Sequence, residues 1–344
     1  MQPWRKHLND GQVIPACPLA INDDGSWSER HQRALVRYYV DAGAGGLAVG
    51  VHSTQFAIRD TQHGLYHPLL KNVSEWLSES LPTGTSFVRI AGICGQTTQA
   101  MAEAEFSVVH GYHAGLLSLA ALRDAAEEEL IYHCQSVSNI IPIIGFYLQP
   151  AVGGRVLSYA FWRKLAENDR VVAIKIAPFN RYQTWDVIRA VIDSGREDLV
   201  LYTGNDDNII VDLLTPFTSC GATRFISGGL LGQWAVWTRN AVEMLKDIQQ
   251  VRTTKVYPAE WLSKNVALTD ANAAVFDAAN GFAGCIPGIN EILRRQGLMP
   301  SSRCLDPDEA LSPGQASELD RIIDAYPSLT DHEFVLENLD RWLA

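Results

Sequence analysis

The chain lacks the features that mark membrane-spanning, secreted and nucleic-acid-binding proteins. No apolar run approaches the roughly 18–20 residues that cross a bilayer. The N-terminus, MQPWRKHLNDGQ, has no apolar core of a signal peptide. Lysine and arginine are outnumbered by acidic residues, which gives a formal net charge of −11. Because binding to phosphates or anionic lipid needs a basic surface, we expect neither a nucleic-acid partner nor a membrane partner.

Cysteine motifs and nucleotide-binding loops are missing as well. Six cysteines are scattered through 344 residues, and no two of them form a C-x-x-C pair. This spacing is not typical of a disulfide framework or a zinc site. Neither G-x-G-x-x-G nor G-x-x-x-x-G-K follows a predicted strand, which argues against a nucleotide cofactor. We therefore expect a cytoplasmic protein with reduced thiols and no cofactor.

What the chain does have is a regular alternation of short apolar runs with amphipathic helical patterns. The runs are continuous in hydrophobicity, as strands covered on both faces should be, and they recur at the spacing of a βα unit. The predicted strands are Val13–Ala16, Gly46–Val51, Phe87–Gly92, Gly115–Leu119, Pro142–Tyr147, Val171–Ile176, Leu199–Tyr202 and Arg224–Ser227. Eight such repeats predict an α/β protein of the (β/α)8 TIM-barrel class.

The alternation stops near residue 245. Helical patterns then cover Ala271–Phe276, Ile286–Gln296 and Gln315–Ala325, with Pro- and Ser-rich connections between them. No flexible linker precedes these helices. We therefore expect a barrel over residues 1–245 and a C-terminal helical extension over residues 246–344 that packs on the barrel.

Lys175 is the strongest candidate for chemistry. It lies near the end of the apolar run Val171–Pro178, and burial in such a strand lowers the pKa of a lysine. A neutral amine attacks carbonyl carbons, so this lysine is a candidate Schiff-base nucleophile. The alternative interpretation is a lysine that extends its ammonium group to solvent without a chemical role.

Tyr147 ends the apolar run before that of Lys175. The two residues are 28 positions apart, about the length of a strand, a helix and two loops. We expect both side chains to emerge at the same end of adjacent parallel strands, where the phenol would transfer protons. The alternative is a packing tyrosine with a solvated hydroxyl.

The order of these segments resembles the dihydrodipicolinate synthase / N-acetylneuraminate lyase family. The similarity covers Gly11–Asp24, a Gly- and hydroxyl-rich stretch after strand 2, Tyr-x-x-Pro after strand 5, Ile-Lys in strand 6, Gly-Asn-Asp-Asp after strand 7 and Ile-Ser after strand 8. The resemblance implies a metal-free class I lyase or aldolase that acts on pyruvate or a longer 2-oxo acid, in a homo-oligomer, either a dimer or a tetramer. It also implies that Lys175 forms the Schiff base and that Tyr147 is the acid–base residue.

The resemblance extends to the substrate-binding segments. It implies that the backbone of Gly50, Val51, His52, Ser53 and Thr54 holds the substrate carboxylate. It places Gly204, Asn205, Ile226 and Ser227 on the opposite wall of the site.

Three departures from the family pattern predict an activity other than dihydrodipicolinate synthesis. The threonine pair of the synthase appears as Val51 and His52, and the segment Leu119–Asp124 has no tyrosine where the family has a second one. The arginine that binds the aldehyde's carboxylate is replaced by Val152, with Arg155 out of register. Another aldolase, hydratase-aldolase or dehydratase of the same class is expected.

His52 and Arg123 have additional candidate roles. The imidazole of His52 would replace the missing relay, because histidine titrates near neutral pH. Its alternative role is a hydrogen-bonded polar residue at a strand end. Arg123 would bind a second carboxylate or a hydroxylated tail, and its alternative is a solvated helix-start arginine.

Two other function classes remain open at this stage. One is a non-catalytic barrel that binds a 2-oxo acid as a sensor or assembly subunit, which the lost relay residues would fit. The other is a metal-dependent barrel that uses His63 with His67 or His110 with His113. The first histidine pair lies beside Pro68, in poor helix context, and the second precedes strand 4, on the face away from the expected site.

Overall fold

Eight parallel strands form the centre of the molecule. The structure is a computed structural model that describes residues 2–254 and 256–344. The barrel strands are β1 (Val13–Pro15), β2 (Gly46–Val49), β3 (Val88–Ile93), β4 (Ala114–Leu117), β5 (Ile143–Leu148), β6 (Val171–Ala177), β7 (Val200–Thr203) and β10 (Gly228–Leu231). Their order is β1-β10-β7-β6-β5-β4-β3-β2. A parallel bridge between Ala16 and Ala48 joins the two ends of this sheet, so the predicted barrel is confirmed.

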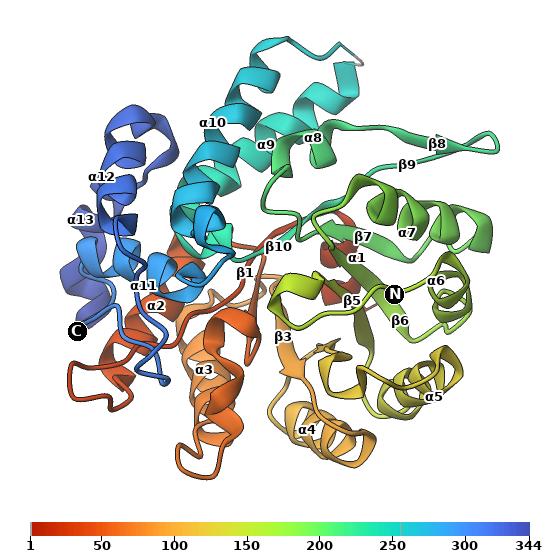
Figure 1. Cartoon of the computed structure of the whole chain (residues 1–344), viewed down its shortest axis with the longest axis horizontal. Coiled ribbons are helices and arrows are strands. Elements are labelled where there is room, and N and C mark those ends of the chain that lie inside the picture. Colours follow the sequence, from red (N-terminus) through yellow and green to blue (C-terminus); the bar gives the residue numbers. More distant parts are fainter. Residues whose placement is uncertain (1, 255) are drawn as a thin grey trace.

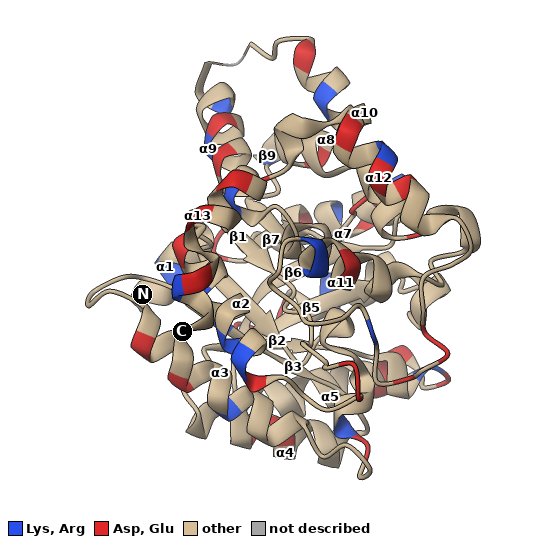
Figure 2. Ribbon diagram, turned by 90° about the vertical axis from the view of Figure 1, so that its left-hand side faces the viewer, with Lys and Arg blue, Asp and Glu red and all other residues tan. Residues whose placement is uncertain are grey.

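Helices surround the barrel and continue beyond it (Figure 1). They are α1 (Pro3–Asn9), α2 (Glu29–Asp41), α3 (Tyr66–Ser80), α4 (Thr97–Val109), α5 (Glu127–Ser138), α6 (Tyr159–Leu165), α7 (Arg181–Ser194), α8 (Ile209–Leu214), α9 (Thr238–Thr254), α10 (Glu260–Val275), α11 (Cys285–Arg295), α12 (Gln315–Ala325) and α13 (His332–Leu343). The three helical patterns predicted near the C-terminus are thus confirmed as α10, α11 and α12. Charged residues of both signs lie along the outer helices, whereas the strands carry few (Figure 2).

The apolar side chains of the strands divide into two layers. Side chains such as Ile14, Ile90 and Ile144 fill the barrel interior. Their neighbours along each strand pack outward against the helices. This alternation follows from the two-residue period of a strand. The same alternation determines which strand side chains point into the barrel.

The eighth barrel strand begins four residues later than the sequence pattern predicts. Residues Ala222–Arg224 form β9, which pairs in an antiparallel hairpin with β8 (Phe217–Ser219). The parallel strand next to β1 and β7 is Gly228–Leu231. The prediction of a barrel strand at Arg224–Ser227 is therefore wrong, because a hairpin occupies part of that apolar segment.

The C-terminal helices pack against the same chain. The predicted boundary at residue 245 falls inside α9, and α13 contacts α2 near the start of the chain. Trp342 of α13 is fully buried, and its indole Nε1 donates to Asp41 Oδ2 at 2.6 Å. Within the described residues, no helix is long and apolar enough to cross a membrane.

Candidate active site

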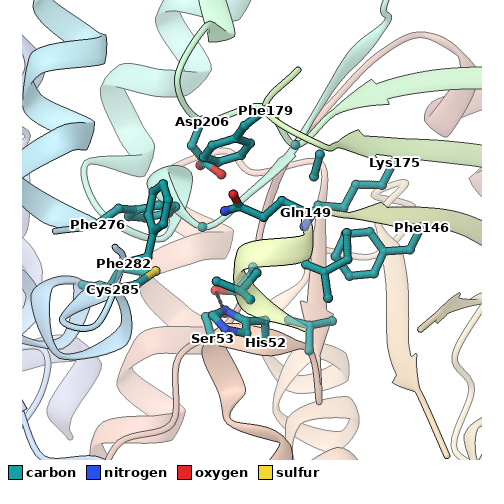
Figure 3. A pocket seen from close by; sticks show the side chains of 18 residues that line it. His52, Ser53, Phe146, Gln149, Lys175, Phe179, Asp206, Phe276, Phe282 and Cys285 are labelled. Atoms are coloured by element: carbon teal, nitrogen blue, oxygen red, sulfur yellow. Dashed lines mark hydrogen bonds between the residues drawn. The ribbon is translucent and has the colours of Figure 1, made fainter. Parts of the chain in front are cut away.

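A pocket opens where the C-terminal ends of the barrel strands meet the C-terminal helices. Its floor includes Lys175 of β6 and Phe146 of β5. Its walls include the turn after β2, the segment after β7, and residues from the α10–α11 region (Figure 3). Active sites of (β/α)8 barrels lie at this end, so the location agrees with the expected face.

Lys175 projects into this pocket from a strand that is otherwise apolar. The residue is only 8% exposed, and its Nζ lies 4.6 Å from the centre of the Phe146 ring. Burial lowers the pKa of the amine, because the charged form loses its hydration. Gly204 leaves room for the lysine, since an added Cβ there would lie 2.6 Å from Lys175 Cε. A larger fraction of Lys175 is therefore in the neutral, nucleophilic form than for a solvent-exposed lysine.

Asp206 is the acid that faces this amine. Its carboxyl is 6% exposed, and its Oδ1 accepts a hydrogen bond from Gln233 N at 2.9 Å. Burial raises the pKa of Asp206, and the charge of Lys175 opposes that shift in part. No direct ion pair joins the two groups. The pocket therefore contains one amine and one carboxyl, both displaced toward their neutral forms.

His52 lines the pocket on the turn η1 (His52–Thr54). Burial, together with the charge of Lys175, lowers the pKa of His52 to about 4. The imidazole is therefore neutral at pH 7. This lowered pKa argues against the expected titration of His52 near neutral pH. The side chain remains a hydrogen-bonding group on the pocket wall.

The predicted carboxylate-binding turn is only partly free to bind a ligand. Thr54 Oγ1 accepts hydrogen bonds from the backbone N–H groups of Gly50 and Val51, at 3.0 and 3.2 Å. Thr54 and Gly50 do not line the pocket, whereas Val51, His52 and Ser53 do. Ser53 Oγ donates to Ala16 O at 2.8 Å. In the described chain no hydrogen bond is found for the N–H groups of His52 and Ser53.

Tyr147 does not enter the pocket. In the pairing of β5 with β6, Lys175 is matched with Phe146, and Tyr147 is matched with Ile176. The tyrosine therefore points outward, where its ring lies 5.1 Å from that of Trp162. Its hydroxyl donates to Leu157 O at 3.4 Å and accepts from Leu157 N at 3.2 Å. The prediction that Tyr147 and Lys175 emerge side by side is wrong, because a one-residue difference in register moves a side chain to the opposite face.

The predicted opposite wall is present only at Gly204. Asn205 is fully buried beside the pocket, and its Oδ1 accepts from Phe179 N at 3.0 Å. Ile226 and Ser227 precede β10, so they lie at the N-terminal end of that strand, away from the pocket. Placing them in the site is wrong, as a consequence of the shifted eighth strand. Gly232, just after β10, lines the pocket at the corresponding C-terminal end.

Neither candidate arginine reaches the pocket. Arg123 is exposed and does not line the cavity. Arg155 Nη1 donates to the carbonyl oxygens of Leu122 and Ala125, at 2.9 and 2.8 Å. The prediction that Arg123 binds substrate is thus not supported by its position.

Three of the four histidines of the metal interpretation, His67, His110 and His113, pack against aromatic rings. His67 lies 4.4 Å from the Phe106 ring centre, and His113 stacks on Trp4 at 5.3 Å. Within residues 2–254 and 256–344, no group of three or more His, Cys, Asp or Glu side chains is placed to hold a metal ion. These histidines therefore do not form a ligand set in the described structure.

Sequence reasoning missed Asp206 and the phenylalanines that line the pocket. Asp206 lies in the Gly-Asn-Asp-Asp run, directly after Asn205. The sequence analysis assigned Asn205 to the site instead. The sequence analysis selected the adjacent Tyr147 instead of Phe146. Phe276 and Phe282 come from the C-terminal extension, about a hundred residues after Lys175, and no local motif connects them to the site.

The fold and the site define a (β/α)8 barrel protein with a lysine-centred pocket at the C-terminal ends of its strands. The chain belongs to the dihydrodipicolinate synthetase family, whose model matches residues 9–325. The resemblance inferred from the sequence is confirmed.

Relatives with known names support this family assignment. A 4-hydroxy-tetrahydrodipicolinate synthase from Bifidobacterium longum (strain DJO10A) is 26% identical over 227 residues, covering 64% of this chain and 68% of that protein. The structure of YagE, a prophage protein of the dihydrodipicolinic acid synthase family from E. coli K12 in complex with pyruvate, is similar with a TM-score of 0.74 and 15% identity, covering 92% of this chain and 98% of that one. N-acetylneuraminate lyase from Fusobacterium nucleatum complexed with pyruvate gives a TM-score of 0.71 and 16% identity, with coverage of 92% and 97%. Lyases are thus among the members of the family.

Proposed function

We propose that this protein is a class I lyase in which Lys175 forms a Schiff base with pyruvate or a longer 2-oxo acid. The observation that carries the proposal is the buried Lys175 amine, with its lowered pKa, in a pocket that also holds the Asp206 carboxyl. Two structural neighbours were solved with pyruvate, which supports a 2-oxo acid as the ligand class. The cavity volume of ≈ 60 Å³ offers room for about four or five water-sized groups.

The first step is attack of the neutral Lys175 amine on the 2-oxo carbon. The carbinolamine that results must lose its hydroxyl as water, which requires a proton at that oxygen. Asp206, protonated through its raised pKa, is the group that supplies it. The backbone N–H groups of His52 and Ser53 hold the substrate carboxylate while this happens.

The resulting iminium carbon withdraws electrons from the adjacent C3 atom. Loss of a C3 proton, or cleavage of the C3–C4 bond, then gives an enamine that this withdrawal stabilises. The Asp206 carboxylate formed in the first step accepts the proton released at C3 or at the C4 hydroxyl. Asp206 thus replaces the tyrosine as the proton-transfer group in our proposal. Phe146 contributes only a ring face beside the amine.

A non-catalytic barrel that binds a 2-oxo acid is the second candidate. Its supporting observation is that Phe146, which has no proton to transfer, occupies the position beside Lys175 where Tyr147 was expected. Such a protein would bind pyruvate without forming an enamine.

Exchange of the pyruvate methyl protons with deuterated water separates these functions. The lyase proposal predicts enzyme-dependent loss of the methyl proton resonance, because enamine formation removes a C3 proton. Lys175→Met should abolish this exchange, while its circular dichroism spectrum should match that of the wild type. Pyruvate binding without exchange in the wild-type protein would support the binding barrel instead.

A further inference from the structure

Asn205 connects two segments that line the pocket. It lies between Gly204, which is in close contact with the Lys175 side chain, and Asp206, the proposed acid. Its side chain is fully buried, and its Oδ1 accepts a hydrogen bond from Phe179 N at 3.0 Å. Phe179 follows β6, the strand of the lysine, whereas Asn205 follows β7. One amide therefore joins the ends of the two strands that supply the amine and the acid.

The hydrogen bond from Phe179 supports an unfavourable backbone conformation. Phe179 has φ = 52°, in the left-handed region that residues with side chains rarely adopt. Without Asn205 Oδ1, its part-buried N–H would lose its partner, which costs the desolvation of that group. Figure 3 shows Phe179 and Asp206 on the same side of the pocket. The turn that follows β6 on this side of the pocket thus depends on Asn205.

Asp212 of α8 anchors the other end of the Asn205 amide. The Asp212 side chain is fully buried, and its Oδ2 accepts from Asn205 Nδ2 at 3.0 Å and from Thr203 Oγ1 at 2.7 Å. Its Oδ1 accepts from Arg181 Nη1 and from Asn208 Nδ2, the latter at 3.3 Å. Thr203 Oγ1 in turn accepts from Asn205 N at 3.1 Å. A buried carboxylate with these donors holds a defined position, because charge-assisted hydrogen bonds are strong and directional.

Both ends of the Asn205 amide have hydrogen-bond partners. Its Nδ2 donates to Thr184 Oγ1 at 3.2 Å as well as to Asp212. Aspartate has nearly the same shape, but it could not donate these bonds and would place a second carboxylate beside that of Asp212. In the described part of the chain, neither Asn205 nor Asp212 lines the pocket. Any effect of these two residues on the reaction therefore passes through the segments that they hold.

We propose that Asn205 and Asp212 are positioning residues that fix the proposed acid, Asp206, relative to the Schiff-base amine; this inference rests on the lyase function proposed above. The acid gives a proton to the carbinolamine oxygen and later accepts one released at C3, so it must stay within hydrogen-bond reach of both. A displacement of about 1 Å can slow such a step by about 10²-fold.

The network should affect turnover more than substrate binding. In the proposed complex the substrate carboxylate binds the N–H groups of His52 and Ser53. Figure 3 shows these residues on the side of the pocket away from Asp206. Loosening the acid should therefore lower kcat and leave KM for pyruvate nearly unchanged.

The test is pyruvate methyl exchange in deuterated water, measured with the full chain. Asn205→Asp and Asp212→Asn each keep the size of the side chain and remove the contact between the two residues. We expect kcat for exchange to fall by about 10-fold or more in each variant, with KM for pyruvate within about 3-fold of the wild-type value. Thr203→Val is a milder variant, which removes the hydroxyl that bridges Asp212 and Asn205 N. It should lower kcat by about 3-fold and keeps the test decisive where a stronger variant does not fold.

Asp331→Asn is the matched control. Asp331 is likewise a buried carboxylate, and it accepts hydrogen bonds from Tyr38 Oη, Arg239 N and Gln296 Nε2 at 2.7, 3.1 and 2.9 Å. It lies at the start of α13, and within the described residues it is not part of the pocket lining. This variant should unfold at a lower urea concentration than the wild type while its kcat and KM stay at wild-type values.

The double variant Asn205→Asp/Asp212→Asn tests whether the two residues act as one unit. It should lose no more kcat than the more impaired single variant, because both changes remove the same contact. Losses that multiply, unchanged kcat in the folded network variants, a rise in KM as large as the fall in kcat, or an equal loss of kcat in Asp331→Asn would each overturn the inference. If the wild type shows no methyl exchange, the proposed lyase function fails, and this inference fails with it.

Discussion

At the scale of single residues, two carboxylic acids adjacent in the sequence have different surroundings. Asp206 lines the pocket, whereas Asp207 does not. We expect Asp206→Asn to lower turnover by roughly 10²–10⁴, the range for loss of a general acid–base group. Asp207→Asn is the matched control and should retain turnover within a few-fold. Steady-state kinetics on both variants decides this, and equal losses would show that Asp206 has no special role in proton transfer.

The hydroxyl of Tyr147 has a structural role in this account, because within residues 2–254 and 256–344 its hydrogen bonds are to the Leu157 backbone. Tyr147→Phe should therefore reduce the free energy of unfolding by about 1 kcal/mol, the usual value of one hydrogen bond. Turnover should change by less than about 3-fold, since the side chain lies outside the pocket. Urea unfolding and steady-state kinetics measure the two effects. A folded variant with strongly reduced turnover would show that the Tyr147 hydroxyl takes part in catalysis.

Lys175 lines the pocket, and its signal in the sequence is local: one amine in an otherwise apolar strand. Tyr147 was misplaced because a strand's inward or outward direction depends on pairing with its neighbour. The pairing of β5 with β6 contains an irregularity between Ile143 and Ile144. No feature of the sequence within either strand predicts that irregularity.

At the scale of elements, His133 connects α5 to the start of α4. The residue is fully buried, its Nδ1 lies 2.9 Å from Thr97 Oγ1, and burial lowers its pKa to about 4. An unfolded chain, with the ordinary histidine pKa of 6.5, takes up a proton between pH 6.5 and pH 4 that the folded chain does not. The contribution of His133 to stability therefore falls as the pH drops through that window.

The variant His133→Asn should lack this pH-dependent loss, because asparagine does not titrate. We expect the stability difference between wild type and variant to shrink as the pH is lowered from 7 to 4.5. Chemical unfolding at several pH values measures this difference. A constant difference across that range would show that His133 takes up its proton equally in the folded and the unfolded chain.

Seven of the eight barrel strands were predicted at their observed positions, because each is a continuous apolar run followed by a helical pattern. The eighth was placed early because β9 and β10 follow one another closely. The strand propensity of Ala222–Arg224 is satisfied in a hairpin with β8 instead of in the barrel. Which of two adjacent apolar segments joins a sheet depends on tertiary pairing.

At the scale of the whole molecule, α13 returns to α2 near the beginning of the chain. Trp342 is fully buried there, and its ring lies 5.5 Å from that of Tyr38. We expect Trp342→Ala to lower the free energy of unfolding by about 3–5 kcal/mol, as for other large core truncations. Leu336→Ala is the control on the same helix, at a residue that is 68% exposed. Urea unfolding should show one transition in all three proteins, and a second transition in the wild type would mean that the extension folds as a separate unit.

The C-terminal extension also explains why only part of the site could be predicted from the sequence. The lysine half of the pocket comes from strands and turns whose order follows the barrel repeat. The opposite side of the pocket takes Phe276 and Phe282 from a segment outside that repeat. It takes Phe179 from a left-handed backbone conformation that the sequence does not specify. These contacts depend on how the extension folds back over the barrel. They became visible only in three dimensions.

The central claim, covalent chemistry at Lys175, is tested most directly by borohydride reduction in the presence of pyruvate, followed by mass spectrometry of the intact protein and its peptides. The reduced Schiff base is a stable secondary amine that adds one pyruvate-derived group to one residue. We predict a single adduct on the peptide that contains Lys175, and no adduct in Lys175→Met. An adduct that persists in Lys175→Met, or none in the wild type with pyruvate or with longer 2-oxo acids, would contradict the claim.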